Sequence, residues 1–85
     1  MKIPTIGQIV LFHFRLGRSQ RLFTRPACVI AAEKTGHCDL NVFWGAEEYI
    51  YARTDRAIKP LVLDVIIAPD GIPDNHTWTF RQEDL

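Results

Sequence analysis

The sequence predicts a small, mainly β protein in which five short strands close into a barrel. Its 85 residues are expected to form a single domain, 1–85, because a chain of this length can build one hydrophobic core. Hydrophobic residues make up 47% of the chain, which favours a folded domain over a disordered one. These residues gather in short runs that are rich in β-branched and aromatic side chains, and turn residues separate the runs.

Each predicted strand is one of these runs. The first, QIVLFHF, follows Gly7, and the second is expected to begin at Pro26, because proline is tolerated at the first residue of a strand. A polar turn, 34–39, joins the second strand to the third and so predicts a hairpin. The third run alternates, with Leu40, Val42 and Trp44 on one face and Asn41 and Phe43 on the other. The five predicted strands are residues 8–14, 26–33, 40–44, 61–69 and 76–80.

The last two strands are also predicted from alternation. Asp64 marks the solvent face of the fourth, so we expect Leu63, Val65 and Ile67 on the buried face. Residues 70–75 are dense in turn formers. The fifth strand places Trp78 and Phe80 on one face, and the polar tail 81–85 is expected to fray.

Residues 45–60 have no single assignment. The acids in AEEYIYA suit the first turn of a helix, whereas Tyr49-Ile50-Tyr51 is typical of a strand. TDRAIKP, residues 54–60, is compatible with one helical turn. The segment therefore stays open between helix, strand and loop.

Five strands this short must curl to cover their apolar face and remove exposed edges. We therefore expect an SH3-like barrel with long loops after the first and third strands. An OB-type barrel is the alternative.

The order GQIVLFHF, RPACVIAA, CDLNVFWG, TWTF resembles a group of small proteins encoded by tailed phages and prophages. Those proteins have a GrIV strand, an RPAiVv strand, a vNLqVF strand and a closing GTWhWP segment. The resemblance covers about half of the chain and departs at Thr79 and Phe80, where the family has a second tryptophan and then a proline. It implies an SH3-like barrel of phage or prophage origin and no particular activity. The matching positions are Gly7, Ile9, Val10, Arg25, Pro26, Ala27, Val29, Leu40, Val42, Phe43, Thr77 and Trp78.

The formal net charge of zero hides an uneven distribution. Residues 1–32 contain five basic residues and no acid, whereas residues 33–85 contain five basic residues and ten acids. Such a charge dipole steers association with a partner. It differs from the overall basicity of a dedicated nucleic-acid binder.

The stretch FRLGRSQRLFTRP is the predicted partner-binding loop, because arginine and aromatic residues are enriched at interface hot spots. Its candidate residues are Arg15, Arg18, Arg21, Phe23 and Arg25. Trp44, Tyr49 and Tyr51 form a possible aromatic surface. The partner is expected to be a protein or a second copy of the chain. Nucleic acid is the alternative, bound by the arginines and stacked on the aromatics.

Nothing in the sequence points to catalysis, a metal or a cofactor. Ser19 lies outside any G-x-S-x-G elbow, and Cys28 is expected to be a small buried apolar residue with a free thiol. The three histidines fall in different elements, and the zinc-ligand spacings are missing. No secretory signal or membrane span is predicted, so we expect a cytoplasmic protein, in the host cell if phage-encoded. The expected function is that of a non-enzymatic phage accessory protein in virion assembly or modulation of a host protein.

Overall fold

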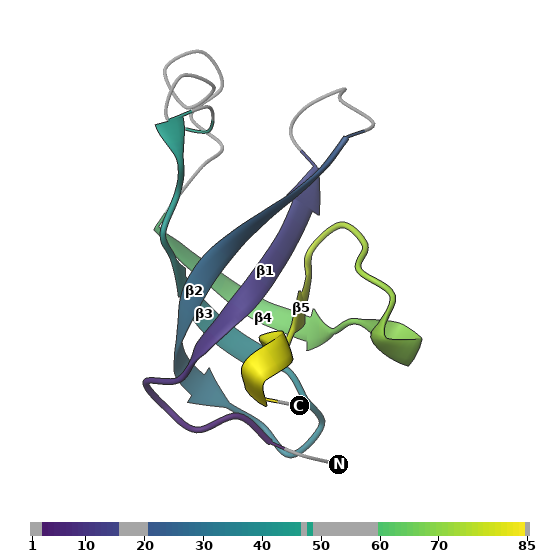
Figure 1. Cartoon of the computed structure of the whole chain (residues 1–85). Helices are drawn as coiled ribbons and strands as arrows, with labels where there is room; N and C mark the ends of the chain where they lie inside the picture. Colours follow the sequence, from purple (N-terminus) through teal and green to yellow (C-terminus); the bar gives the residue numbers. More distant parts are fainter. Residues whose placement is uncertain (1–2, 16–20, 47, 49–59, 85) are drawn as a thin grey trace.

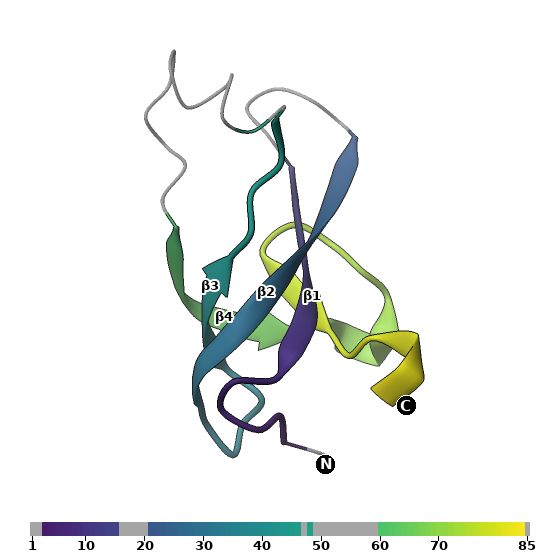
Figure 2. The ribbon, with the colours of Figure 1, turned by 60° about the vertical axis from the view of Figure 1, so that its left-hand side comes forward.

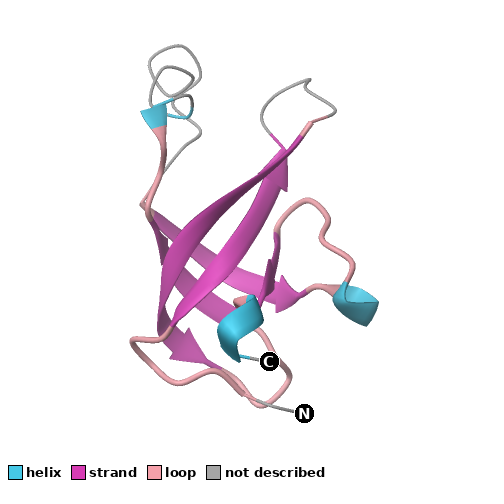
Figure 3. Ribbon diagram, viewed as in Figure 1, coloured by secondary structure: helices cyan, strands magenta, loops and turns pink. Residues whose placement is uncertain are grey.

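The computed structural model describes residues 3–15, 21–46, 48 and 60–84. Arg18, Ser19, Tyr49, Tyr51 and all but the last residue of the segment 54–60 lie outside the described residues. The strands are β1 (Ile9–Arg15), β2 (Leu22–Ala32), β3 (Cys38–Val42), β4 (Leu61–Ile67) and β5 (Thr77–Thr79), with short 3-10 helices η1 (Pro69–Gly71) and η2 (Gln82–Asp84) (Figures 1 and 3).

The strands close into the predicted five-stranded barrel. β1 pairs antiparallel with both β2 and β5, and β4 pairs parallel with β5, which completes the ring. The strands follow one another around the barrel in sequence order. An OB-type barrel is a Greek-key arrangement, so this order favours the SH3-like type.

The predicted hairpin of the second and third strands is confirmed, but its first strand is longer than expected. β2 begins at Leu22, so Pro26 lies inside the strand and does not open it. Pro26 lies one residue beyond the last β2–β3 ladder pair, Ala27 with Val42, so its missing N–H falls at the end of that ladder. Its carbonyl oxygen accepts a hydrogen bond of 3.0 Å from the Phe43 N–H.

A β-bulge in β4 overturns part of the predicted alternation. Cys38 pairs with Val65 and Leu40 pairs with Val62, so β4 carries one residue more than β3 between these pairs. Asp64, with a φ of 55°, lies at the irregularity, and its N–H donates to Asp39 Oδ1 at 2.8 Å. Val65 is buried as predicted, but Leu63 is 62% exposed, because the extra residue reverses which positions face inward.

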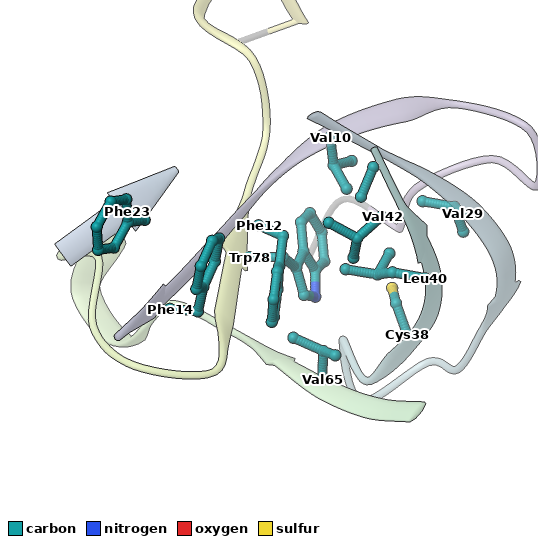
Figure 4. Close-up of a cluster of buried hydrophobic side chains, with 11 residues drawn as sticks. Val10, Phe12, Phe14, Phe23, Val29, Cys38, Leu40, Val42, Val65 and Trp78 are labelled. Atoms are coloured by element: carbon teal, nitrogen blue, oxygen red, sulfur yellow. The ribbon is translucent and has the colours of Figure 1, made fainter. Parts of the chain in front are cut away.

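Trp78 lies at the centre of the core. Its side chain is fully buried among residues from all of the other four strands (Figure 4). Its indole ring meets Phe80 edge-on, with 5.0 Å between ring centres, as their shared face predicted. The core residues around it are Val10, Phe12, Phe14, Phe23, Ala27, Val29, Cys38, Leu40, Val42 and Val65. In the tail, residues 82–84 form η2, and Arg81 Nε donates to Asp84 Oδ2 at 3.0 Å.

Candidate protein-binding face

The solvent side of β2, β3 and β4 is apolar over most of its width. We call it the outer face and define it by Pro26, Cys28, Ile30, Phe43, Leu61 and Leu63, with Asn41 at its centre. The view of Figure 2 shows how β2, β3 and β4 follow one another across this region.

Strand register brings the outer-face residues together in rows. Cys28 pairs with Asn41, and Asn41 pairs with Leu61, so these three side chains form one row across three strands. Phe43 lies beside Pro26 in the next row, as the hydrogen bond between their backbones shows. Directly opposed side chains on one face have Cβ atoms about 5 Å apart, so each row is continuous.

The outer face is well exposed to solvent. Phe43 is 48% exposed, Leu61 52% and Ile30 42%, and Leu63 adds to them at the edge of the bulge. Burying a large apolar side chain contributes about 1.5–3 kcal/mol, so the fold forgoes this stabilisation at several neighbouring positions. A contiguous exposed patch of this kind marks an interaction site more often than isolated apolar residues do.

Charges of opposite sign lie at the two ends of the β2 strand. Near the β2–β3 turn are Glu33, Asp39 and Asp64, with Lys34 beside them, so this end is net acidic. Near the other end of β2 are two exposed residues, Arg15 at the end of β1 and Arg21, and neither belongs to the outer face. Arg15 Nη2 lies 3.8 Å from Asp74 Oδ1, and the Arg21 guanidinium lies 4.7 Å from the Phe23 ring centre.

Phe23 and Arg25 of the predicted loop belong to the barrel itself. Phe23 is 8% exposed and stacks on Phe14 at 5.6 Å, so its ring is part of the core. Arg25 binds the fully buried Glu48 through two hydrogen bonds, from Nε to Oε1 and from Nη2 to Oε2. Gly45 makes room for the guanidinium, because a Cβ there would lie 2.8 Å from Arg25 Nε. The ion pair thus attaches the chain after β3 to β2.

Trp44 of the predicted aromatic surface is only half-buried and packs edge-on against Phe14 and Phe12, at 5.0 and 6.0 Å between ring centres. The structure therefore places Arg15 beside Asp74 and Arg21 over Phe23. It places Phe23, Arg25 and Trp44 against other parts of the barrel.

Most of the outer face was not predicted from the sequence. Alternation placed Phe43 opposite the buried positions, but Leu63 was assigned inward and Cys28 was expected to be buried, whereas it is half-buried on the outer face. The run LVLDVII could have predicted it. This strand is apolar on both faces, and because so small a barrel buries only one face of each strand, the other apolar face must lie outside.

The titratable groups inside the barrel serve its structure. His13 donates or accepts through both ring nitrogens, Nδ1 to Thr24 Oγ1 and Nε2 to Thr79 Oγ1, each at 2.8 Å. Burial lowers the pKa of His13. Burial, with the neighbouring Asp39 charge, raises the pKa of the Cys38 thiol to about 11, so this thiol is protonated at neutral pH.

Within the described part of the chain, no three His, Cys, Asp or Glu side chains form a group that could hold a metal ion. None of the helices described there is long and apolar enough to cross a membrane. Comparison of the chain with protein families, with curated proteins and with solved structures finds no match.

Proposed function

We propose that this chain is a non-enzymatic, protein-binding β-barrel of phage or prophage origin, which acts in virion assembly or modulates a host protein in the host cytoplasm. One observation carries the binding role: the outer face presents neighbouring apolar side chains from three strands, with Phe43 and Leu61 about half exposed. The sequence resemblance described above supports the phage origin. The protonated Cys38 thiol and the doubly hydrogen-bonded His13 support a structural role for these two residues.

In this proposal the exposed arginines act on the approach of the partner. Arg15 and Arg21, with Arg18 between them in the sequence, would steer an acidic partner toward the barrel, and the outer face would supply the contact area. Rim charges act mainly on the association rate, whereas buried apolar side chains determine how long a complex lasts.

Capture with three baits tests the proposal. The native chain, Phe43→Asp and the control Ile72→Asp are immobilised and exposed to lysates of candidate host cells, with and without phage. Ile72 is 68% exposed and follows η1, outside the outer face, so its substitution matches the change in charge at another exposed apolar site. A specific protein held by the native and Ile72→Asp baits and lost with Phe43→Asp supports the proposal. Equal capture by all three baits, or none by any, contradicts it.

Nucleic-acid binding is the second candidate, favoured by Arg15 and Arg21 near one end of the barrel. It predicts a gel shift at low salt that weakens steeply as salt rises, because each phosphate contact releases about one counterion. Phe43→Asp would leave such a shift nearly unchanged, whereas Arg21→Glu would abolish it. No shift with single- or double-stranded DNA or RNA excludes this alternative.

A further inference from the structure

We propose that the free edge of β4 at residues 61–63 binds an extended segment of a partner protein as an added antiparallel strand, with an arginine or lysine of that segment beside Asp64. This inference rests on the proposed protein-binding function and names the kind of segment that the partner supplies.

The first half of β4 is paired on one side only. β3 pairs with β4 from Leu61 onward, whereas β5, on the other side, pairs only with Ile66 and Ile67 (Figure 1). In the described part of the chain, no strand therefore lies beside residues 61–63 on the β5 side. The barrel closes at the end of β4 and leaves the beginning of this edge open.

The free hydrogen-bonding groups of this edge belong to Leu61 and Leu63. Successive residues of a strand direct their N–H and C=O groups to alternate sides. The Val42 N–H donates to the Pro60 carbonyl oxygen at 2.9 Å, so Pro60 and then Val62 face β3. Leu61 and Leu63 consequently direct their N–H and C=O groups away from β3. An extended peptide has donors and acceptors at the same spacing, so it can pair with this edge.

The side chains at this edge favour an apolar segment. Leu61 and Leu63 belong to the outer face and are 52% and 62% exposed, so a peptide can reach them. Directly opposed side chains of two paired strands contact each other, so β-branched residues of an added strand would pack on both leucines. Pro60 and the bulge at Asp64 lie at the two ends of the edge, and such features limit the pairing of edge strands. The edge therefore takes one short segment.

Two carboxylates at the bulge select a cation at one end of the segment. Asp64 is exposed, and the Asp39 carboxylate accepts a 2.8 Å hydrogen bond from the Asp64 N–H. Neither carboxylate forms an ion pair with another residue that the structure describes. In an antiparallel addition, the residue opposite Asp64 precedes those opposite the leucines, so the cation belongs at the N-terminal end of the segment, where opposite charges fix the register. This requirement concerns the added segment alone, so it is compatible with a partner that is acidic elsewhere.

NMR titration of the full chain with a synthetic peptide measures this binding. The probe is arginine followed by Val-Thr-Val-Thr, blocked at both ends, so that its valines oppose the two leucines. Because the open edge is short, we expect a dissociation constant of about 0.1–1 mM. The amide signals of Leu61 and Leu63 should shift and gain protection from solvent exchange. The Val62 amide, which belongs to the pair with Leu40, should be protected with and without the peptide.

Methylated peptides test the hydrogen bonds on the native chain. N-methylation of both valines removes the donors that face β4 and should abolish binding. N-methylation of both threonines, whose N–H groups face away from β4, is the matched control and should preserve it. Binding that survives methylation of the valines, or no binding of the unmodified probe, overturns the inference.

Variants of the chain locate the site. Leu63→Pro removes a free N–H without taking a bond from the β3 ladder, so it should abolish binding with unchanged circular dichroism. Leu63→Val keeps the N–H and an apolar side chain, and should retain binding. Asp64→Asn should weaken binding of the arginine peptide about two- to five-fold, and should not affect a peptide with glutamine in place of arginine. Equal binding by the native chain and a folded Leu63→Pro, or an equal effect of Asp64→Asn on both peptides, contradicts the inference.

The failures of the two proposals are distinguishable. A native chain that captures another protein through Phe43, but does not bind the peptide, overturns the strand addition and leaves the protein-binding proposal standing. A chain with neither property overturns both.

Discussion

The indole Nε1 of Trp78 donates a 2.8 Å hydrogen bond to the carbonyl oxygen of Gly36, and both groups are buried. This bond joins β5 to the turn between β2 and β3, which lie far away in the sequence. The Cys38 Sγ also lies near this oxygen, at 3.8 Å. The core and the hairpin turn are therefore stabilised by one side chain.

Replacing Trp78 with Phe should destabilise the barrel by about 2–4 kcal/mol, because it leaves the Gly36 oxygen with only the weak Cys38 S–H donor and creates a cavity. Urea unfolding followed by circular dichroism measures the change. Trp44→Phe is the control. Because Trp44 is only half-buried, this variant should lose far less of its free energy of unfolding. Equal losses in both variants contradict the central role of the Trp78–Gly36 bond.

The stability of the barrel should fall as the pH drops below about 6.5. Burial lowers the pKa of His13 in the folded state, so the unfolded chain binds the proton more readily. The contribution of neutral His13 is complete above the unfolded pKa of about 6.5 and is lost as the pH falls through the lower folded pKa. Urea midpoints at pH 7.5 and 5.5 should differ in the native chain. They should differ less in His13→Gln, and an unchanged pH dependence in that variant rules out His13 as the cause.

The ion pair of Arg25 and Glu48 should show an asymmetric response to mutation. Arg25→Ala leaves a fully buried carboxylate unpaired and should cost about 2–4 kcal/mol. Glu48→Ala should cost less, because the Arg25 side chain is 28% exposed and can reach water. Thermal or urea unfolding of both variants tests the order.

The substitution Gly45→Ala should disturb the ion pair of Arg25 and Glu48. Its Cβ would lie 2.8 Å from Arg25 Nε, so the guanidinium must move away from Glu48. We expect a loss of about 1–2 kcal/mol in the native background, as for other overpacking changes. In the Arg25→Ala background the loss should nearly vanish, because the obstructing group is gone. Additive losses in the double variant contradict this contact.

Asp64 should tolerate glycine better than valine. Its φ of 55° lies in the left-handed region, where a β-branched residue is strained and glycine is not. Asp64→Val should destabilise the barrel by about 1–2 kcal/mol, whereas Asp64→Gly should remain within about 0.5 kcal/mol of the native chain. The comparison is made by urea unfolding at pH 7.5. Similar stabilities for both variants would exclude a left-handed conformation at the bulge.

Local patterns in the sequence were enough to predict the strands, because each strand is a short apolar run bounded by turn residues. The same patterns predicted strand bounds and buried faces less well where the pairing between strands decides them. Pro26 lies inside β2 because the strand also pairs with β1, and Leu63 faces outward because the bulge opposite Asp39 shifts the register. Neither effect is encoded in the residues on either side.

The outer face depends on register even more strongly. Cys28, Asn41 and Leu61 become neighbours only after three strands pair, and no local pattern relates their positions. Arg25 and Glu48 are likewise distant in sequence, so the arginine looked available for a partner until the buried carboxylate was placed beside it. Residue types predicted an interaction surface, whereas strand pairing decides which residues form the outer face.

Closure of the ring by β5 has a consequence for the synthesis of the protein. β1 pairs on one side with β2, which follows directly, but its other partner is β5, near the far end of the sequence. While the ribosome is still making the intervening residues, that edge of β1 has no native strand to bond with, and such edges recruit foreign strands. Pairings between distant segments also form slowly. The nascent chain is thus most vulnerable to aggregation just before Thr77–Thr79 emerges, and a chaperone that shields β1 during that interval would raise the yield of folded barrel.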